Sequence, residues 1–258
     1  MAYALITGAS GGIGWSLAKE LASRKHDVLL VARSAEKLRE NALYLTEKFS
    51  VKADFLPTDL SAPGSAENVI SWVEKKDYPI DILINNAGFG LWGNLAEMST
   101  EELQQMMQLN MLTLVNLCKS AIPLLKQHKK SYILNVGSTA AYQAIPTLTT
   151  YAATKAFVLL FSRGLRHELM GSSISVSCLN PGTTTTGFID RAHMMDSIRK
   201  KSECVTMDPA VVARIGVNGM FAGKAEIIPG ALNWISAKLA ELMPKSVPEK
   251  IAHSLYKG

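Results

Sequence analysis

Short apolar runs and longer amphipathic stretches alternate along the chain. The runs are rich in Val, Ile and Leu, as expected for strands that are buried on both faces. They predict strands at 2–6, 27–32, 52–56, 81–84, 132–136, 173–179 and 226–229. The amphipathic stretches predict helices at 12–24, 35–49, 64–76, 100–128, 149–170, 187–202 and 208–222. A last stretch, 231–258, mixes apolar residues with lysines and predicts one or two amphipathic helices.

This alternation predicts an α/β fold with a doubly wound parallel sheet. Strand–helix–strand units cross over right-handedly, so the helices cover both faces and give three α/β/α layers. No long linker, low-complexity tract or internal repeat interrupts the alternation. We therefore expect a single domain, in which residues 1–230 form the sheet with its helices and residues 231–258 form a helical extension.

Composition narrows the class of protein. The chain has 258 residues, of which 48% are hydrophobic, so it can bury a sizeable core and is neither disordered nor fibrous. The net charge is +5, but the Lys and Arg residues are scattered, so we expect no nucleic-acid partner. No apolar run approaches the roughly 18 residues that a membrane span needs. The three widely spaced cysteines and the lack of a signal sequence predict a cytoplasmic protein, and no histidine pair has metal-ligand spacing.

A glycine-rich turn follows the first predicted strand and opens the first predicted helix. Residues 7–14 read Thr-Gly-Ala-Ser-Gly-Gly-Ile-Gly. Such a turn lets the backbone approach a pyrophosphate closely, and the helix N-terminus offers free N–H groups to the phosphates. No Gly-Lys-Ser/Thr follows, which excludes a nucleotide-triphosphate P-loop. The turn predicts the dinucleotide site of a Rossmann fold, with contacts from Gly8, Ser10, Gly11, Gly12, Ile13 and Gly14.

The end of the second predicted strand indicates which dinucleotide binds. A site for NAD usually places Asp or Glu there, to hold the ribose 2′-hydroxyl. Here the strand ends in Arg33 and Ser34, with no acid. A guanidinium can pair with a 2′-phosphate, and the serine hydroxyl can assist. NADP is therefore favoured over NAD.

A tyrosine and a lysine lie one helical turn apart in the predicted helix at 149–170. Tyr151 and Lys155 share a helix face, so the ammonium group can sit near the phenol. A neighbouring cation lowers a phenol pKa from about 10 towards the neutral range, where the phenol can act as an acid or base. Ser138 follows the predicted strand 132–136, at the carboxyl edge of the sheet where ligands bind.

The ordered set of motifs resembles the short-chain dehydrogenase/reductase family, in its common subtype of roughly 250 residues. The resemblance runs from Thr7 to about residue 187. It rests on the glycine-rich turn, Asp59 in Thr-Asp-Leu, Asn-Asn-Ala-Gly at 85–88, Asn110, Ser138, Tyr151 with Lys155, and Asn-Pro-Gly at 180–182 with Thr186. Each motif alone is weak, whereas their order along one chain is specific.

The resemblance implies an oxidoreductase that moves a hydride between NADP(H) and a carbonyl or alcohol substrate. Tyr151 would exchange a proton with the substrate oxygen, Lys155 would lower the tyrosine pKa and bind the nicotinamide ribose, and Ser138 would polarise that oxygen. Asn110 would hold a water in a proton relay through Lys155. Cofactor contacts implied beyond the glycine-rich turn are Arg33, Ser34, Asp59, Leu60, Asn86, Ala87, Gly88, Tyr151, Lys155, Pro181, Gly182, Thr184 and Thr186.

Apolar residues beyond the predicted strand ends indicate a lipophilic substrate of medium size. We expect the pocket to be lined by Phe89, Leu91, Trp92, Tyr142, Gln143 and Ile145. The segment 183–207, with Phe188, Ile189, Met194 and Met195, is expected to form a lid over it.

Alternative functions remain open at this point. A 3-oxoacyl thioester reductase of fatty-acid synthesis would carry the same motifs, and a non-catalytic NADP-binding sensor or scaffold could use the same fold. The amphipathic C-terminal stretch is weakly compatible with association at a membrane surface. Relatives usually pair the long helices near 100–128 and 149–170, so we expect a homodimer, with a tetramer as the other possibility.

Overall fold

The computed structural model describes residues 2–185 and 206–256. Within them, one parallel sheet of seven strands has the order β3-β2-β1-β4-β5-β6-β7. The strands are β1 (Tyr3–Thr7), β2 (Asp27–Ala32), β3 (Ala53–Pro57), β4 (Ile80–Asn85), β5 (Ser131–Val136), β6 (Ile174–Leu179) and β7 (Glu226–Ile227). All seven strands were predicted, with differences of one or two residues at their ends. Every residue of β1, β2 and β5 is buried, as their continuous apolar sequences predict.

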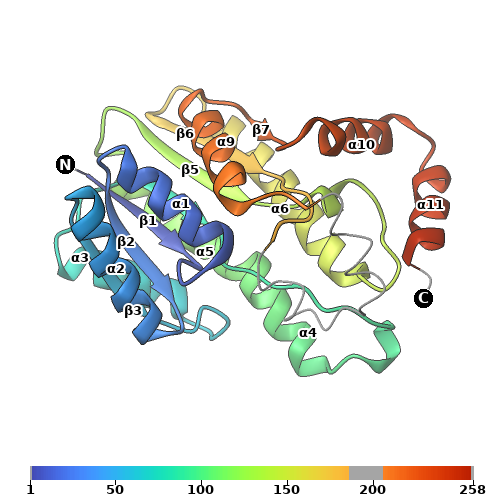
Figure 1. Cartoon of the computed structure of the whole chain (residues 1–258), viewed down its shortest axis with the longest axis horizontal. Helices are drawn as coiled ribbons and strands as arrows, with labels where there is room; N and C mark the ends of the chain where they lie inside the picture. Colours follow the sequence, from blue (N-terminus) through green and yellow to red (C-terminus); the bar gives the residue numbers. More distant parts are fainter. Residues whose placement is uncertain (1, 186–205, 257–258) are drawn as a thin grey trace.

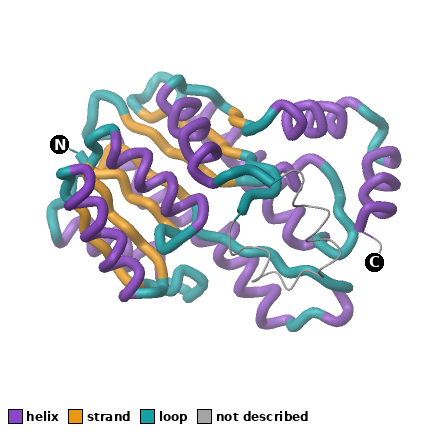
Figure 2. Tube along the Cα trace, viewed as in Figure 1, coloured by secondary structure: helices purple, strands orange, loops and turns teal. Residues whose placement is uncertain are grey.

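Helices cover both faces of the sheet (Figures 1 and 2). One face packs against α1 (Gly12–Ser23), α2 (Ala35–Phe49) and α9 (Pro209–Phe221). The other packs against α3 (Ser65–Lys75), α5 (Leu114–Leu125) and α6 (Thr149–Glu168). Each fully buried Leu or Ile side chain in these two layers contributes roughly 2 kcal/mol through burial. The predicted doubly wound α/β fold is confirmed.

Most of the predicted helices have their expected positions. The exceptions are the helix predicted at 100–128, which is broken, and the one predicted at 187–202, which lies outside the described residues. Helix α2 begins and ends at the predicted residues because Ser34 accepts a hydrogen bond from the Lys37 N–H at its start and Ser50 adopts a left-handed conformation at its end. Helix α9 begins after Asp208, whose carboxylate accepts from the Ala210 N–H. The predicted helix 187–202 and most of the predicted lid fall outside the described residues.

The prediction of one continuous helix at 100–128 is wrong. The structure has α4 (Thr100–Met107), a π-helical turn (Gln108–Thr113) and α5. The π turn brings Asn110 into the core, where its side-chain amide bonds to the backbone of Phe89. Such turns are often found at functional sites. The apolar periodicity continues through this segment and therefore does not reveal the break.

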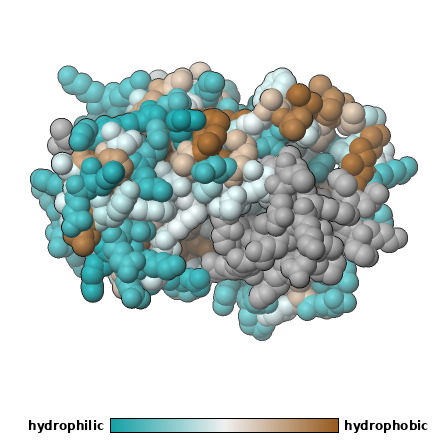
Figure 3. All heavy atoms as spheres, viewed as in Figure 1, coloured by the Kyte–Doolittle hydropathy of each residue, from teal (hydrophilic) through white to brown (hydrophobic). Residues whose placement is uncertain are grey.

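Two further helices follow β7. They are α10 (Ala231–Leu242) and α11 (Ser246–Tyr256), drawn in red in Figure 1, so the prediction of amphipathic helices in this stretch is confirmed. Ala237 and Ala240 of α10 are buried against the rest of the molecule, and Leu232 and Leu242 are exposed. Figure 3 shows apolar side chains on the surface over these helices. Among the described residues, every helix is too short or too polar to cross a membrane.

Candidate active site

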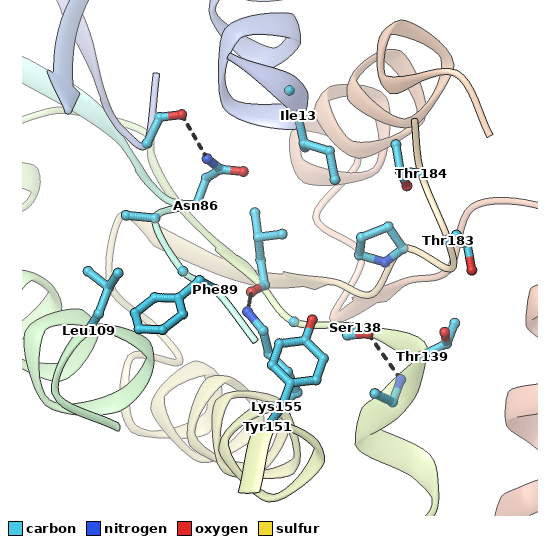
Figure 4. A pocket seen from close by; sticks show the side chains of 18 of the residues that line it. Ile13, Asn86, Phe89, Leu109, Ser138, Thr139, Tyr151, Lys155, Thr183 and Thr184 are labelled. Carbon is cyan, nitrogen blue, oxygen red and sulfur yellow. Dashed lines mark hydrogen bonds between the residues drawn. The ribbon is translucent and has the colours of Figure 1, made fainter. Parts of the chain in front are cut away.

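A cavity of about 730 Å³ lies at the carboxyl ends of the strands. The strand order reverses between β1 and β4, and at such a switch point the two flanking connections run to opposite faces and leave a crevice. Figure 4 shows side chains from widely separated segments converging there. The cavity extends from the glycine-rich turn after β1 to the start of α6.

The glycine-rich turn is held against the end of β4 by Asn86. Its side-chain amide donates to the carbonyls of Thr7 and Gly8, at 2.9 Å and 3.3 Å. Gly8 has φ of +68°, and a Cβ there would lie 2.6 Å from Asn86 Nδ2. A Cβ at Gly14 would lie 2.3 Å from the Gly8 carbonyl oxygen. Glycine is therefore required at both positions by close approach of backbone and amide, and Gly14 acts behind the cavity wall rather than on it.

The N-terminus of α1 opens into the cavity. Ser10, Gly11, Gly12 and Ile13 line the cavity, and Gly11 at the N-cap provides no side-chain cap. The first N–H groups of the helix are thus available to an anion, and the helix dipole adds partial positive charge.

Positive charge gathers at the far end of the cavity, after β2. Arg33 and Ser34, for which a dinucleotide contact is predicted, both line the cavity there. Lys37 and Thr58 also line it, and neither was predicted from the sequence. Lys37 lies in the first turn of α2, and its closeness in sequence to the predicted contacts Arg33 and Ser34 was the available signal.

Ser138, Tyr151 and Lys155 converge at the other side of the cavity (Figure 4). Tyr151 and Lys155 lie on the first two turns of α6, and both side chains are buried. The Lys155 ammonium donates to the Val136 carbonyl at 2.9 Å and lies 5.8 Å from the centre of the Tyr151 ring. The Ser138 hydroxyl accepts from the Ala140 N–H at 3.1 Å, which fixes the hydroxyl at the start of a 3₁₀ turn, η3 (Thr139–Tyr142).

Burial shifts the pKa values of both titratable groups towards their neutral forms. It raises the pKa of Tyr151 to about 12, although a hydrogen bond with Ser138 acts in the opposite direction. It lowers the pKa of Lys155 to about 8. The expected lowering of the tyrosine pKa by Lys155 is not found in this structure, because the ammonium is directed at the Val136 carbonyl and burial dominates.

Asn110 lies behind the cavity, not on its wall. Its amide donates to the Phe89 carbonyl and to the Thr154 hydroxyl, and accepts from the Phe89 N–H. Gly88 separates Asn110 from Lys155: a Cβ at Gly88 would lie 2.9 Å from Asn110 Oδ1 and 3.5 Å from Lys155 Nζ. The side chain of Asn110 therefore shapes the backbone at 88–89, which bounds the space around Lys155.

The remaining predicted cofactor contacts have the following places. Those that line the cavity are Asp59, Leu60, Asn86, Ala87, Gly88, Pro181, Gly182 and Thr184. Asp59 does not cap helix α3, whose N-cap is Gly64; its carboxylate accepts from the backbone and hydroxyl of Ser61. Thr186 lies outside the described residues.

The family of the chain follows from comparison with known proteins. A sequence model described as short chain dehydrogenase matches residues 2–196, which is most of the chain. The chain belongs to the short-chain dehydrogenase family. The resemblance inferred from the motifs is thereby confirmed, and the protein is an oxidoreductase of this family.

Two curated relatives and one solved structure show how far the likeness extends. The chain is 33% identical over 189 residues to chicken (Gallus gallus) hydroxysteroid dehydrogenase-like protein 1, covering 72% of this chain and 57% of that relative. It is 30% identical over 243 residues to a very-long-chain 3-oxoacyl-CoA reductase of Anas platyrhynchos, covering 91% and 74%. A short-chain dehydrogenase from Sphingobium yanoikuyae in complex with NADPH is 30% identical, with a TM-score of 0.82 and coverage of 95% and 98%.

The substrate end of this short-chain dehydrogenase differs in part from the prediction. Phe89, Tyr142, Gln143 and Ile145 line the cavity as expected. Leu91 and Trp92 do not line it; Leu91 is buried in the core, on the side of the sheet that α5 and α6 cover. The contribution of α10 was not predicted: its residues Asn233, Ser236, Ala237 and Ala240 form part of the wall. The sequence offered one signal for this: small residues on one face of the predicted C-terminal helix allow that helix to approach the rest of the molecule closely.

Metal chemistry has no candidate site in the part of the chain that the structure describes. There, no three His, Cys, Asp or Glu side chains gather in a way that could hold an ion. The candidate site consists instead of backbone N–H groups, hydroxyls, one buried amine and two exposed cations.

Proposed function

We propose that the protein transfers a hydride between NADP(H) and a lipophilic carbonyl or alcohol substrate. The observation that supports this best is one cavity that joins an uncapped helix N-terminus behind a glycine-rich turn to a buried Ser–Tyr–Lys cluster. The first feature suits a pyrophosphate and the second suits a reacting oxygen. The relative from Sphingobium yanoikuyae, similar over nearly its full length, is described with NADPH.

The residues present fit such a cofactor. Ser10, Gly11, Gly12 and Ile13 would bind the pyrophosphate through the N-terminus of α1, on a turn that Gly8 and Gly14 allow to pack closely against Asn86. The Arg33, Ser34 and Lys37 group would bind a 2′-phosphate. Contacts to the adenine would come from Asp59 and Leu60, and those to the nicotinamide side from Pro181, Gly182, Thr184 and Thr186. When bound, the cofactor supplies or accepts the hydride.

The chain's own residues would handle the proton and orient the substrate. The Tyr151 hydroxyl donates its proton to the substrate oxygen in reduction and accepts one in oxidation. Its neutral form is favoured by burial, which suits a proton donor at neutral pH. Ser138 donates a hydrogen bond to the same oxygen, and Lys155 binds the ribose hydroxyls next to Tyr151. Asn110 sets the backbone that bounds the Lys155 pocket, where a relay water would be held.

A lipophilic substrate is supported by the side chains beyond Ser138. Phe89, Ile145, Leu148, Ala237 and Ala240 give this end of the cavity a largely apolar wall. A carbonyl compound with an apolar body would bury that body there, with its oxygen between Ser138 and Tyr151.

NADPH oxidation over a panel of ketones, aldehydes and acyl thioesters, with NADH alongside, tests the proposal. We expect turnover with NADPH for lipophilic carbonyl compounds, and a fall of roughly 1,000-fold in Tyr151→Phe because its phenyl ring has no proton to donate. NADPH binding by that variant should be unchanged, since its ring remains. Retained turnover in Tyr151→Phe contradicts the mechanism, and activity confined to acyl thioesters would favour the thioester reductase over the general carbonyl reductase.

We also propose that the protein works in the cytoplasm as a homodimer paired through α5 and α6. Phe157 and Leu160 on α6 are exposed, at 38% and 70%, and so is Leu112 in the π turn before α5. Apolar side chains gathered on two long helices are typical of a subunit interface. Leu160→Glu should convert a dimer to a monomer in light scattering, whereas an unchanged mass would place the interface elsewhere.

A further inference from the structure

Glu226 connects four segments around the substrate end of the cavity. It lies in β7 at the sheet edge, and its side chain is 15% exposed. One carboxylate oxygen accepts a short hydrogen bond from the Tyr142 hydroxyl at the end of η3. The other lies 3.5 Å from Arg163 Nη1 of α6 and 3.8 Å from Lys238 Nζ of α10. None of these residues belongs to the predicted site except Tyr142, which was expected only as part of the pocket wall.

Tyr142 is the member of this group that reaches the cavity. Its ring lines the wall near Ser138, and its hydroxyl also accepts a hydrogen bond from Asn180 Nδ2 at 2.9 Å. The hydroxyl is therefore engaged on both sides, by a carboxylate and by an amide. Because Tyr142 ends the short turn that Ser138 begins, fixing its hydroxyl also fixes that turn.

Helix α10 is the second part of the wall that this carboxylate holds. Lys238 lies on α10 among Ser236, Ala237 and Ala240, the residues that line the cavity. Its ammonium also pairs with Glu241, 2.7 Å away on the same helix. Glu226 is thus the acidic group through which α10 is ionically linked to the sheet in the described part of the chain.

We propose that Glu226 is a positioning residue that orients Tyr142 and α10, and thereby sets the shape of the substrate end of the cavity. The proposal rests on the function proposed above, which gives that end of the cavity its substrate. Glu226 touches neither the glycine-rich turn nor the Ser–Tyr–Lys cluster. Its effect reaches the reacting groups through Tyr142 and the turn that begins at Ser138.

The contacts of Glu226 differ in strength and in direction. Ion pairs of partly exposed side chains such as Arg163 and Lys238 contribute little, because water screens them. A hydrogen bond to a charged acceptor from a buried phenol contributes more and is directional. The hydrogen bond from Tyr142 should therefore dominate, with Lys238 adding a weaker restraint on α10.

Three variants separate the hydrogen bond from the ion pairs, and a fourth serves as the control. Glu226→Ala removes both kinds of interaction. Glu226→Gln keeps an oxygen that can accept from Tyr142 but removes the charge that attracts Lys238 and Arg163. Tyr142→Phe keeps the ion pairs and removes the hydroxyl. Glu20→Gln is the matched control, because Glu20 also forms a partly exposed ion pair, with Arg24, far from the cavity.

Amide hydrogen exchange gives a readout that needs no substrate. In Glu226→Ala we expect exchange at 139–148 to be about 10-fold faster, because this variant breaks the hydrogen bond that Tyr142 donates to a charged acceptor. Exchange at 231–242 should accelerate less, because that helix loses only the ion pair of Lys238. The glycine-rich turn should exchange as in the wild type, and Glu20→Gln should leave both segments unchanged. Uniform acceleration throughout the sheet, or none at 139–148, overturns the proposal.

Steady-state kinetics then tests the consequence for substrate, with 2-undecanone and 2-butanone as probes. These ketones share a reacting group and differ in the length of the apolar chain. We expect kcat/KM for 2-undecanone to fall about 10-fold in Glu226→Ala and Tyr142→Phe, less in Glu226→Gln, with the NADPH Kd unchanged. The fall for 2-butanone should be smaller, because it does not reach α10.

The outcomes distinguish the two proposals. If the wild type oxidises NADPH with none of the carbonyl compounds, the proposed function fails, and the exchange data still decide the role of Glu226. If the wild type turns over and Glu226→Ala behaves as Glu20→Gln does, the positioning role is overturned. Equal losses in NADPH affinity and in ketone KM would also overturn it, because they indicate general destabilisation.

Discussion

The two ends of the cavity are built in different ways. The cofactor end is made of short contiguous segments that follow neighbouring strands, and its main contacts join residues of the turn after β1 with residues after β4. The substrate end is assembled from η3, the residues after β6, and α10, which are linked by side chains such as Tyr142 and Glu226. The first end thus follows from neighbouring strand ends, which the Asn86 side chain joins. The second depends on side-chain contacts among a short turn, the sheet edge and a helix beyond the sheet.

The largest effect is expected at the backbone of the cofactor end, and the chain contains a matched control. A Cβ at Gly14 would lie 2.3 Å from a backbone oxygen, whereas a Cβ at Gly11 meets nothing within 4 Å. Gly14→Ala should therefore lose about 3 kcal/mol of stability and weaken NADPH binding strongly, because backbone cannot give way as a side chain can. Thermal unfolding of both variants measures the loss of stability. Cofactor titration is made on Gly14→Ala against the wild type, because Gly11 would itself contact the pyrophosphate. Equal losses of stability in Gly14→Ala and Gly11→Ala would contradict the requirement for close approach.

A second change sharpens the comparison within the cofactor end by removing charge without altering the backbone. Arg33→Ala should raise KM for NADPH about 10- to 100-fold, the range for a charge-assisted hydrogen bond, and leave NADH kinetics nearly unchanged. Arg39→Ala is the control. Arg39 is exposed, as Arg33 is, but it lies on α2 and does not line the cavity. Equal losses with NADPH and NADH would show that Arg33 does not read the 2′-phosphate.

A third change tests whether α10 governs the substrate end alone. Ala240 is buried and lines the cavity, so Ala240→Leu fills space that a long substrate would occupy. We expect kcat/KM for 2-undecanone to fall about 10-fold, with NADPH affinity unchanged, since an apolar pocket loses about 1–3 kcal/mol per misplaced methylene-sized group. Leu239→Ala, at an exposed position on the same helix, should leave both values unchanged. A loss of NADPH affinity in Ala240→Leu would mean that the two ends are coupled.

The last change acts at the junction of the two ends, and its effect on stability has the opposite sign to that of Gly14→Ala. Burial lowers the pKa of Lys155 to about 8, below its unfolded value of 10.5. Carrying the Lys155 charge therefore lowers the free energy of unfolding. This cost is present in full below pH 8, falls as the pH rises, and is absent above pH 10.5. Lys155→Met should abolish turnover, yet raise the free energy of unfolding at pH 7 relative to the wild type. That advantage should shrink as the pH rises from 8 to 10.5 in chemical denaturation. A constant difference across this range would contradict the effect assigned to burial.

The comparison also explains which parts the sequence could predict. The glycine-rich turn, Arg33 and the Tyr151–Lys155 pair are local patterns whose geometry follows from a strand end or one helical turn. The π turn at Asn110 and the wall supplied by α10 depend on contacts with residues far away in the chain. The hydrogen bond between Tyr142 and Glu226 joins residues 84 positions apart, and nothing in either local sequence indicates it. Leu91 and Trp92 follow a strand end, as cavity residues do, but neither lines the cavity.

Helix α10 gives the molecule a form of modularity. It follows the last strand of the sheet, so no strand pairing depends on it. Near its start, Asn233 packs against Gly182, a residue assigned to the nicotinamide side of the cavity. Further along, Ala237 and Ala240 line the substrate end. Substitutions at these two alanines are therefore expected to change the size of the compounds accepted, while the parts that bind dinucleotide and move the proton stay the same.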